Sequence, residues 1–390
     1  MLSLLKTKKN QFFILFIILF SFLGLASCNQ NADTKVEAIT VKDAIGRDVA
    51  VKTGSYERVV CIGAGALRLY SYVGNLDKLA GVEDIDNLSL DKRPTVFDGV
   101  ARPYVVANEE KFKKLSSCGV GGPQNQIAEA EKILNCNPDI IVSEYEDTDK
   151  ANKLSGDLNV PVVVVSYGSA GVFDAKLKNS LELLGKVFNR NEQAKKVNDF
   201  IASEKAEIER RTKDIVVADQ KKVYVMGLGN WGTTNHLQTA QNYAPFNVAH
   251  INNVVSKLAK DGIQGIEAEM FEKLAPSMDV MIMDAAAVKN IKTLFKENPQ
   301  MFDDCKAWND GEVYLQLAYN AYYTNVEIAL CNTWWSGKVV YPSLFSDIDI
   351  NAKLNQITKV FLGEELASKI NAYPMSYSGY SKVNKETIFN

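Results

Sequence analysis

The sequence predicts an α/β protein made of two Rossmann-like lobes joined by a single long α-helix. Short, continuous β-branched runs alternate with helical patterns in the first half of the chain, and the same alternation restarts from residue 223. Such runs are typical of strands that are buried on both faces of a parallel sheet. Between the two halves, residues 189–222 contain neither Gly nor Pro. Strands that alternate with helices predict sheets covered by helices on both faces.

Six apolar runs are the predicted strands. Those of the first lobe cover residues 58–62, 139–142 and 162–165, and those of the second lobe cover residues 223–226, 280–283 and 313–317. A helix end, a tight turn and a buried strand occur at residues 131–142 and again at residues 272–283. This internal echo agrees with two related lobes, but helix-turn-strand units recur in every α/β protein.

The stretch between the lobes predicts two successive helices. Apolar residues recur at helical spacing over residues 177–188. A second pattern then places four apolar residues on one face, namely Ala194, Val197, Ile201 and Ile208. This second helix is expected to run for about 20 to 25 residues, or roughly 30 to 37 Å. A stiff connection of this kind predicts little hinge closure between the lobes.

Composition and charge argue against several classes of function. The 390 residues are 46% hydrophobic and 23% charged, which is a globular composition with enough apolar residues for a large core. The formal charge of −3 argues against a nucleic-acid partner, which requires a basic surface. With only His236 and His250, a histidine-rich metal site is not expected, and no resident cofactor is predicted. No Ser-His-Asp or paired-carboxylate pattern stands out, so we do not expect an enzyme.

Residues 1–27 are predicted to be a lipoprotein signal peptide. Three lysines precede an apolar core over residues 12–23, which is shorter than the ~20 residues that a membrane-spanning helix needs. Residues 25–28 (LASC) match a bacterial lipobox, in which the Cys28 thiol is alkylated with diacylglycerol and the chain is cut before it. The lipid would anchor the protein to the membrane. The alternative is a transmembrane anchor that ends in Cys28.

The mature chain is expected to have four parts. They are a flexible polar tether (28–38), a first α/β lobe (39–188), the interdomain helix (189–215), and a second α/β lobe with C-terminal helices (216–390). Five further cysteines contain no CxxC pair, so most are expected to be buried small hydrophobes, with one disulfide left open. They are Cys61, Cys118, Cys136, Cys305 and Cys331.

Motifs between residues 39 and 342 carry a family resemblance. Residues 39–51 hold an Asp-x-x-Gly-Arg turn between two short strands, residues 119–122 (GVGG) precede a helix-strand unit, and residues 307–314 (AWNDGEVY) end in Gly-x-Val-Tyr. In this order they resemble the substrate-binding lipoproteins of ABC importers, in the helical-backbone class that handles iron-siderophore, haem and cobalamin. Further stretches resemble a branch assigned to iron compounds, namely residues 65–70, 81–84, 102–104, 319–325 and 337–342. The long turn at residues 275–278 departs from the family pattern.

The resemblance implies a ligand cleft between the lobes and a monomer that is exported and lipid-anchored. It implies capture of an iron chelate and its delivery to a permease dimer with ATPase subunits. Haem, cobalamin and molybdate are the alternative cargoes. The family also presents one acidic residue at the top of each lobe for docking onto permease arginines. Glu131 matches the first of these positions and Glu269 the second, with Glu272 as the fallback.

Ligands in open α/β lobes bind outside the carboxyl ends of strands, so the loops there supply the candidate ligand residues. Gly65 and Arg68 follow the first strand, where Arg68 either pairs with an anionic ligand or lies on the solvent face of a helix. Arg102 and Tyr104 flank a Pro that is expected to fix an extended segment. The alternative for this pair is an ordinary surface loop.

Residues 227–236 (GLGNWGTTNH) are the richest candidate loop and follow the first strand of the second lobe. Small polar groups and an indole suit ligand recognition. The ligand candidates here are Asn230, Trp231, Thr233 and His236. The alternatives are that Trp231 packs in the core, or that GxGxxG is the dinucleotide fingerprint of an exported oxidoreductase. That second alternative lacks its acidic partner, since residues 242–253 contain no Asp or Glu.

Tyr319, Tyr322 and Tyr323 form a tyrosine cluster. Adjacent residues point apart on a strand and diverge on a helix, so Tyr322 and Tyr323 can hold bare ferric iron together only in a loop. Stacking against a planar ligand and core packing are the alternatives. Pairing of these aromatic groups with Arg68 or Arg102 predicts an anionic cargo. The adjacent Trp334 and Trp335 are expected to pack in the core.

Overall fold

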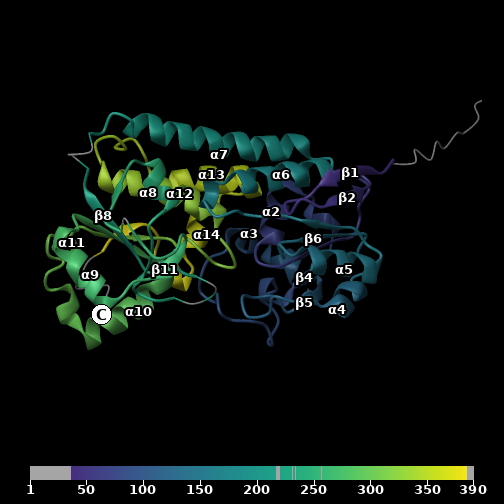
Figure 1. Cartoon of the computed structure of the whole chain (residues 1–390), viewed down its shortest axis with the longest axis horizontal. Helices are drawn as coiled ribbons and strands as arrows, with labels where there is room; N and C mark the ends of the chain where they lie inside the picture. The colour runs from purple at the N-terminus through teal and green to yellow at the C-terminus, as the bar shows by residue number, and fades with distance from the viewer. Residues whose placement is uncertain (1–36, 217–219, 231, 233, 256, 384–390) are drawn as a thin grey trace, which may run out of the picture. The chain divides into compact units, whose positions relative to one another are not determined.

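Two five-stranded sheets form the frame of the protein, one in each lobe (Figure 1). The computed structural model describes residues 37–216, 220–230, 232, 234–255 and 257–383. All of the described chain from Ala38 onward belongs to one compact unit, and both lobes lie within it. The predicted signal peptide, most of the tether and Cys28 lie outside the described residues.

The N-terminal lobe has a parallel sheet with the strand order β5-β4-β3-β6-β7. Its strands are β3 (Val59–Ile62), β4 (Leu79–Glu83), β5 (Ser116–Gly119), β6 (Ile140–Ser143) and β7 (Val162–Val164). Three of them coincide with predicted apolar runs, and every residue of these three is buried. The helices of this lobe are α2 (Ala66–Val73), α3 (Pro103–Phe112), α4 (Ala130–Asn135), α5 (Thr148–Leu158) and α6 (Ala175–Val187).

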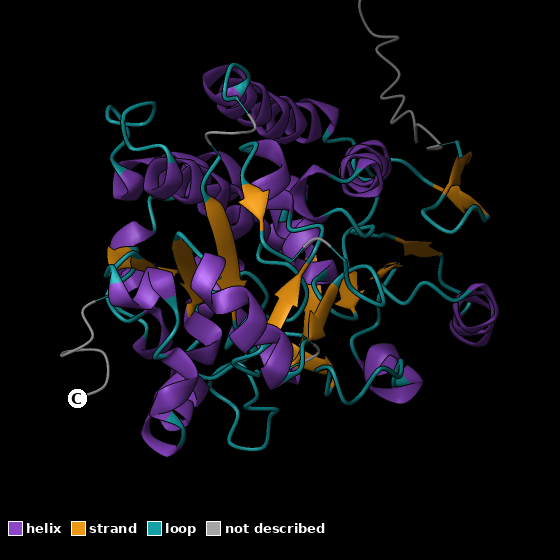
Figure 2. Ribbon diagram, turned by 60° about the vertical axis from the view of Figure 1, so that its left-hand side comes forward, coloured by secondary structure: helices purple, strands orange, loops and turns teal. Residues whose placement is uncertain are grey.

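The C-terminal lobe has the strand order β10-β8-β12-β13-β14, in which only β14 is antiparallel to its neighbour among the described strands. These strands are β8 (Lys222–Met226), β10 (Asn252–Asn253), β12 (Val280–Asp284), β13 (Val313–Gln316) and β14 (Ser381–Lys382). The lobe's helices are α8 (Ala244–Val248), α9 (Ala268–Leu274), α10 (Val288–Glu297), α11 (Lys306–Asn309), α12 (Val326–Val340), α13 (Ile350–Leu362) and α14 (Ala367–Asn371). Figure 2 shows the strands of both sheets between layers of helices.

Two small antiparallel pairs complete the described strands. The predicted opening hairpin is formed by β1 (Ile39–Lys42) and β2 (Asp48–Val51). Arg47 in its turn donates to the Asp43 carboxylate over 2.7 Å and to the Val162 carbonyl over 2.6 Å. The hairpin is thereby tied to β7. The second pair is β9 (Gln238–Ala240) with β11 (Ile263–Gly265), beside the interlobe cavity described below.

A single long helix, α7 (Asn191–Thr212), joins the lobes and runs along the upper edge of the molecule in Figure 1. Its 22 residues correspond to a length of about 33 Å at 1.5 Å per residue. It packs against α2 and α6 of the first lobe and against α12 and α13 of the second. The four residues predicted for its apolar face, Ala194, Val197, Ile201 and Ile208, are all buried.

The lobes also share a hydrophobic core, in addition to their connection through α7. One apolar cluster runs from the first sheet through α2 and α6 to α12 and α13. Within it the ring of Tyr72 on α2 meets the ring of Phe361 on α13 edge to face, with centroids 4.8 Å apart. Trp334 and Trp335 on α12 are buried in this core, as predicted. A continuous core that crosses from lobe to lobe resists hinge motion.

Two features differ from the sequence prediction. Pro103 begins helix α3 instead of fixing an extended segment, because proline is well suited to the first turn of a helix, where its missing N–H is not needed. Strands β4 and β5 were not predicted, since LAGVE and SSCG are not continuous apolar runs.

The five described cysteines are buried and free, so the disulfide left open does not form among them. None of the described helices is both long and apolar enough to span a membrane.

Candidate ligand site between the lobes

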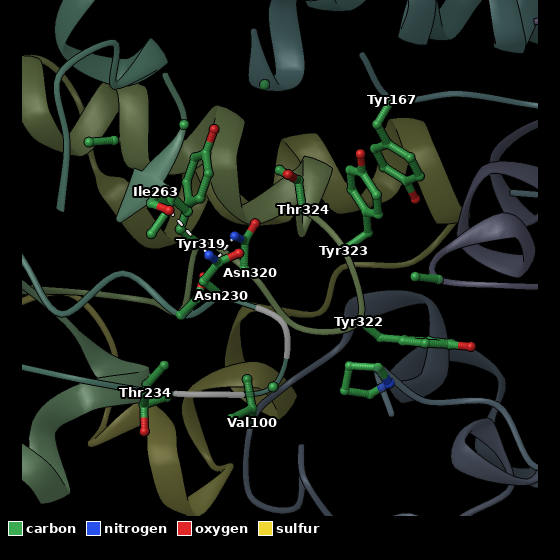
Figure 3. A pocket seen from close by; sticks show the side chains of 18 of the residues that line it. Val100, Tyr167, Asn230, Thr234, Ile263, Tyr319, Asn320, Tyr322, Tyr323 and Thr324 are labelled. Carbon is green, nitrogen blue, oxygen red and sulfur yellow. Dashed lines mark hydrogen bonds between the residues drawn. The ribbon is translucent and has the colours of Figure 1, made fainter. Parts of the chain in front are cut away.

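A cavity of about 300 Å³ lies between the two lobes, at the carboxyl ends of strands from both sheets (Figure 3). The first lobe contributes the loops after β3, β4, β5 and β7, and the second lobe contributes the loops after β8, β12 and β13 together with residues at β9 and β11. Open α/β sheets bind ligands at this edge because the strand ends leave loops free to converge. The cavity is therefore the candidate ligand site.

Five tyrosines line the cavity, and the described lining residues include no charged side chain and no histidine. The tyrosines are Tyr167, Tyr243, Tyr319, Tyr322 and Tyr323. The remaining polar wall is made of amides and hydroxyls, from Asn230, Asn242, Asn320, Thr234, Thr324 and Ser169. A wall of this kind offers rings for stacking and neutral groups for hydrogen bonds.

The tyrosine loop, residues 319–325 between β13 and α12, forms one side of the cavity (Figure 3). Asp284 at the end of β12 fixes the start of this loop, since its carboxylate accepts hydrogen bonds from the Tyr319 N–H and from Gln316 Nε2, both over 2.9 Å. Asn320 Nδ2 donates to the Gly229 carbonyl over 2.8 Å. The loop is thus joined to the end of β12 and to the glycine-rich loop after β8.

Tyr322 and Tyr323 point in different directions, as Figure 3 shows. Tyr322 extends into the first lobe, where its hydroxyl donates to Glu83 Oε2 over 2.6 Å. Tyr323 instead stacks on Tyr167, with ring centroids 4.3 Å apart and 22° between the planes. The two hydroxyls therefore do not converge on one point, and the arrangement does not form a paired tyrosinate ligand for bare ferric iron.

The first lobe supports Tyr167 by a close backbone approach. The Tyr167 hydroxyl donates to the Gly65 carbonyl over 2.9 Å, and a Cβ atom at Gly65 would lie only 2.3 Å from that hydroxyl. Glycine at position 65 is also required by its φ of +78°. Gly65 does not line the cavity, so its part is to place Tyr167, which does.

Three carboxyl groups near the cavity have pKa values shifted upward. Burial raises the pKa of Glu83 to about 7, against the hydrogen bonds from Tyr322 and the Gly63 N–H, which favour the charged form. Burial raises the pKa of Asp284 to about 7 as well. Burial, together with the nearby Glu146 and Glu83, raises the pKa of Glu144 to about 9. Glu144 is therefore mostly neutral at neutral pH, and Glu83 and Asp284 are only partly ionised there. Asp174 differs, because backbone N–H groups, including that of Ser169, hold the pKa of its carboxyl below the usual value.

Arg68 is fully buried and does not line the cavity, contrary to the predicted contact with an anionic ligand. It lies on α2, and its guanidinium bonds to the second lobe's backbone rather than facing solvent. Arg102 is likewise buried, in an ion pair with Asp86 and a 2.7 Å bond to the Ile85 carbonyl. Tyr104, at helical position two of α3, donates to the same Asp86 over 2.7 Å. Arg102 and Tyr104 therefore serve the packing of the first lobe, whereas Arg68 serves its contact with the second.

The remaining predicted ligand residues fall into two groups. Asn230, Tyr319, Tyr322 and Tyr323 line the cavity. His236 does not line it; the side chain is half-buried, and this burial lowers the pKa of its imidazole. Trp231 and Thr233 lie outside the described residues.

The glycine-rich loop at residues 227–236 does not have the context of a dinucleotide site. In that site the fingerprint opens a helix, whose N-terminus binds the pyrophosphate. Here the next described element after β8 is strand β9, and Gly227 donates its N–H to the Gln238 carbonyl over 2.8 Å. The loop turns back into a short strand, which argues against the oxidoreductase alternative.

Several lining residues were not predicted from the sequence. Tyr167 lies two residues after a predicted strand, so the rule that favours strand ends would have found it. Asn320 and Thr324 lie within the tyrosine cluster, and the Oδ1 atom of Asn320 is buried without a hydrogen-bond partner. Tyr243 precedes α8, and no sequence pattern indicates that it lines the cavity, because its place depends on how β9 folds against β11.

Comparison with known proteins agrees with this architecture. Residues 59–315 match the family model described as periplasmic binding protein. Among curated proteins, the molybdate-binding protein MolA of Haemophilus influenzae is 22% identical over 269 residues, which cover 64% of this chain and 73% of MolA. The petrobactin-binding protein YclQ of Bacillus subtilis is 23% identical over 230 residues, covering 56% of this chain and 65% of YclQ.

Solved structures have the same fold. A periplasmic solute binding protein from Veillonella parvula superposes with a TM-score of 0.66 at 20% identity, covering 86% of this chain and 97% of that one. MolA bound to molybdate superposes with a TM-score of 0.64 at 17% identity, covering 83% and 98%. Because the family model spans more than half of the sequence and two lobes are joined by one long helix, the chain belongs to the periplasmic binding protein family, in its helical-backbone class, whose members are solute-binding proteins.

Proposed function

We propose that the protein is the substrate-binding component of an ABC importer that captures an iron chelate and delivers it to a membrane permease with its ATPase subunits. The observation that carries this proposal is the cavity between the lobes, which is lined by five tyrosines from both sides. Family membership supplies the solute-binding role, and the aromatic wall supports a cargo with planar or ring-bearing groups.

The iron is proposed to enter as a chelate rather than as a bare ion. Tyr322 and Tyr323 send their hydroxyls in different directions, so they do not form a ligand pair. The described lining residues carry no carboxylate, imidazole or thiol that would replace them. An organic chelator would satisfy the metal, and the protein would contact the chelator through rings, amides and hydroxyls.

The cargo is proposed to present a neutral surface to the protein, in place of the anionic cargo expected from the sequence. Arg68 and Arg102 are bonded elsewhere, so the described wall holds no cation to pair with an anionic ligand. Recognition by neutral groups favours a chelate whose outer surface is neutral or whose charge is turned toward solvent. We therefore propose stacking and neutral hydrogen bonds as the basis of affinity.

Molybdate is a second candidate cargo, favoured by a separate observation. The cavity offers amides and hydroxyls around about 300 Å³, and a small oxyanion is held well by several neutral donors. One relative, MolA, is named as a molybdate-binding protein, and another, YclQ, as a petrobactin-binding protein. These two relatives have different cargoes, so similarity to them does not select one.

A thermal-shift panel distinguishes these candidates. The purified protein is heated with ferric siderophores, haem, cobalamin, molybdate or NAD, each over a range of concentrations. A ligand present at about 100 times its Kd should stabilise the folded state by about 2.7 kcal/mol. A shift with ferric siderophores supports the main proposal, and a shift with molybdate alone supports the second. A shift with NAD alone would contradict both.

Membrane attachment through Cys28 is a further part of the proposal. It rests on the LASC sequence that follows a short apolar core, and these residues lie outside the described part of the chain. Labelling cells with a palmitate analogue should mark the wild-type protein but not Cys28→Ser. Equal labelling of both proteins would reject the lipobox.

Docking onto the permease is proposed through Glu131 and Glu269. Both are exposed, and each is the second residue of a short helix that precedes a central strand, α4 before β6 and α9 before β12. The repeated pattern of the two lobes aligns Glu131 with Glu272, so the choice of Glu269 rests instead on its Glu-x-Phe-x-x-Leu context and its place in α9. Glutamates are also favoured at such positions by the helix dipole alone, and only a docking role predicts that charge reversal stops uptake while leaving cargo affinity unchanged.

A further inference from the structure

We propose that Arg68 and Glu83 of the first lobe are positioning residues that hold the tyrosine loop of the second lobe in its cavity-lining conformation. One wall of the cavity would then exist only while the lobes are in contact. The inference takes the cavity as the ligand site, and in that respect it rests on the proposed function. Its evidence is the set of bonds that cross from lobe to lobe.

Arg68 reaches from α2 into the tyrosine loop. Its Nη2 atom donates to the Ala321 carbonyl over 2.6 Å and to Asn325 Oδ1 over 2.9 Å, and its Nη1 atom donates to the Tyr322 carbonyl over 3.0 Å. The guanidinium also lies 4.8 Å from the centre of the Tyr104 ring. A fully buried cation that donates to two backbone carbonyls of another lobe fixes the path of that backbone.

Glu83 holds the same loop through a side chain. The Tyr322 hydroxyl donates to Glu83 Oε2 over 2.6 Å and accepts from the Gly122 N–H over 3.1 Å. Glu83 is itself fixed at the end of β4, because its Oε1 atom accepts from the Gly63 N–H over 3.0 Å. The loop is therefore bonded to the first lobe at its backbone and at the tip of Tyr322.

The conformation held in this way is unfavourable by itself. Tyr322 and Tyr323 have φ values of +53° and +72°, in the left-handed region that bulky residues rarely adopt. Two such residues in succession persist only when their surroundings impose the conformation. The bonds from Arg68 and Glu83 provide that constraint, because they act on the carbonyl and the hydroxyl of the first of the two tyrosines.

The cavity wall depends on this constraint. With the loop held, Tyr323 stacks on Tyr167, and Asn320 and Thr324 face each other across an antiparallel bridge while lining the cavity. If the lobes separate, the loop loses Arg68 and Glu83 at the same time and is free to leave the left-handed conformation. Separation of the lobes would then dismantle the wall that holds the cargo, and this couples opening to release.

Hydrogen exchange of the ligand-free, full chain tests the inference without knowledge of the cargo. Three amides in and at the ends of the loop are hydrogen-bonded, those of Tyr319, Ala321 and Asn325. In Arg68→Met the Ala321 and Asn325 amides should exchange about 10- to 100-fold faster, as expected when buried bonds from a charged donor are lost. Amides of β12 should keep their rate. Equal acceleration in β12 and in the loop would show a general loss of stability and overturn the proposal.

Arg102→Met is the matched control. Arg102 is a buried arginine of the same lobe, but its side-chain bonds go to Asp86, Ile85 and Tyr104 within that lobe. Its loss should leave exchange in residues 319–325 within about twofold of wild type, after correction for any change in global stability. A loop that opens as much in Arg102→Met as in Arg68→Met would contradict a specific role for Arg68.

A second pair of variants keeps the test decisive if Arg68→Met does not fold. Tyr322→Phe removes the bond to Glu83 and retains the ring, whereas Glu83→Gln retains an acceptor for the Gly63 N–H and a polar partner for the Tyr322 hydroxyl. Tyr322→Phe should accelerate loop exchange by about 3- to 10-fold, and Glu83→Gln should stay near wild type. Unchanged hydrogen exchange of the loop amides in Tyr322→Phe would overturn the proposal that Glu83 holds the tyrosine loop. Failure of every cargo in the thermal-shift panel would instead refute the proposed function and leave these exchange results standing.

Discussion

The rings of Tyr167 and Tyr323 stack across the lobe boundary, with their centroids 4.3 Å apart and their planes inclined by 22°. Tyr167 follows the last strand of the first sheet, and Tyr323 belongs to the loop before α12. Both rings line the cavity, so the lobes meet at the place where a ligand would be held. A cargo that stacks here contacts both lobes at once.

Removal of the Tyr323 ring should weaken cargo binding. In Tyr323→Ala we expect the Kd of the ferric chelate that raises Tm most to increase by about 5- to 30-fold, since an aromatic contact contributes about 1 to 2 kcal/mol. Tyr323→Phe retains the ring and should remain within about threefold of wild type. Isothermal titration of the two variants measures both values. Equal affinity of Tyr323→Ala and wild type would exclude stacking on this ring.

Stability should fall as the pH rises toward neutrality, in part because of Glu83. Its pKa is about 7 in the folded protein and 4.5 in an unperturbed carboxyl group, so the folded state binds more protons than the unfolded state between these values. The contribution of Glu83 is therefore most favourable below about pH 4.5 and is lost by about pH 7, by roughly 3 kcal/mol. Asp284, with a pKa of about 7, adds a loss of the same sign.

The variant Glu83→Gln isolates the contribution of Glu83 to this pH dependence of stability. The amide cannot ionise, so the difference in unfolding free energy between this variant and wild type should grow in favour of the variant from pH 5 to pH 8. Urea unfolding at several pH values in this range gives the difference directly. Parallel pH profiles for the two proteins would mean that Glu83 does not titrate in this window.

Gly171 is expected to tolerate no side chain, because it lies against the cavity wall. Its φ is +68°, and a Cβ atom there would lie 2.5 Å from the Tyr319 hydroxyl. Gly171→Ala should therefore displace Tyr319 and weaken cargo binding, in addition to a backbone cost of about 1 kcal/mol. Thermal unfolding and titration with the ferric chelate measure these two effects.

Gly262→Ala is the control for that substitution. Gly262 also lines the cavity and has a φ of +87°, but a Cβ atom there would meet no other atom within 4 Å. It should show the backbone cost alone, again about 1 kcal/mol, with nearly unchanged affinity. If the two variants bind the chelate equally well, close approach of Tyr319 to residue 171 is not needed for the site.

Glu131 and Glu269 should affect uptake without affecting affinity. Neither residue lines the cavity, and both are exposed on their helices. Reversal of both charges, Glu131→Arg with Glu269→Arg, should abolish uptake, because like charges would then face each other across the permease interface. The Kd for the ferric chelate should remain that of wild type. Normal uptake by the double variant at a normal expression level would exclude these residues as docking charges.

Much of the fold was predictable because it depends on local patterns. The apolar runs at β3, β6, β7, β8 and β12 are buried throughout, and the helical spacing from Ala194 to Ile208 lies on the buried face of α7. Strand β5 had no such pattern. Its Ser116 is exposed and the strand lies at an edge of the sheet, where continuous apolar composition is not required.

The candidate site was predictable only in part, because it depends on contacts between distant segments. The strand-end rule pointed to the loops of Asn230 and Tyr319, and both residues line the cavity. It did not reveal that the Arg68 guanidinium bonds to carbonyls 253 and 254 residues away. An arginine beside a glycine-rich turn has the same local sequence whether it binds an anionic ligand or a backbone. Only the fold decides between them.

The location of the cargo in the interlobe cavity is tested most directly by blocking the cavity mouth. Ser169 is exposed and lines the cavity, so Ser169→Trp should place an indole in the ligand's path with little effect on folding. Ala372→Trp adds the same group at an exposed position in a separate groove beside α3 and α14. In titrations with the ferric chelate, we predict at least a roughly 30-fold loss of affinity for Ser169→Trp and none for Ala372→Trp, a difference of about 2 kcal/mol. Wild-type affinity in Ser169→Trp would contradict the assignment of the cavity as the binding site.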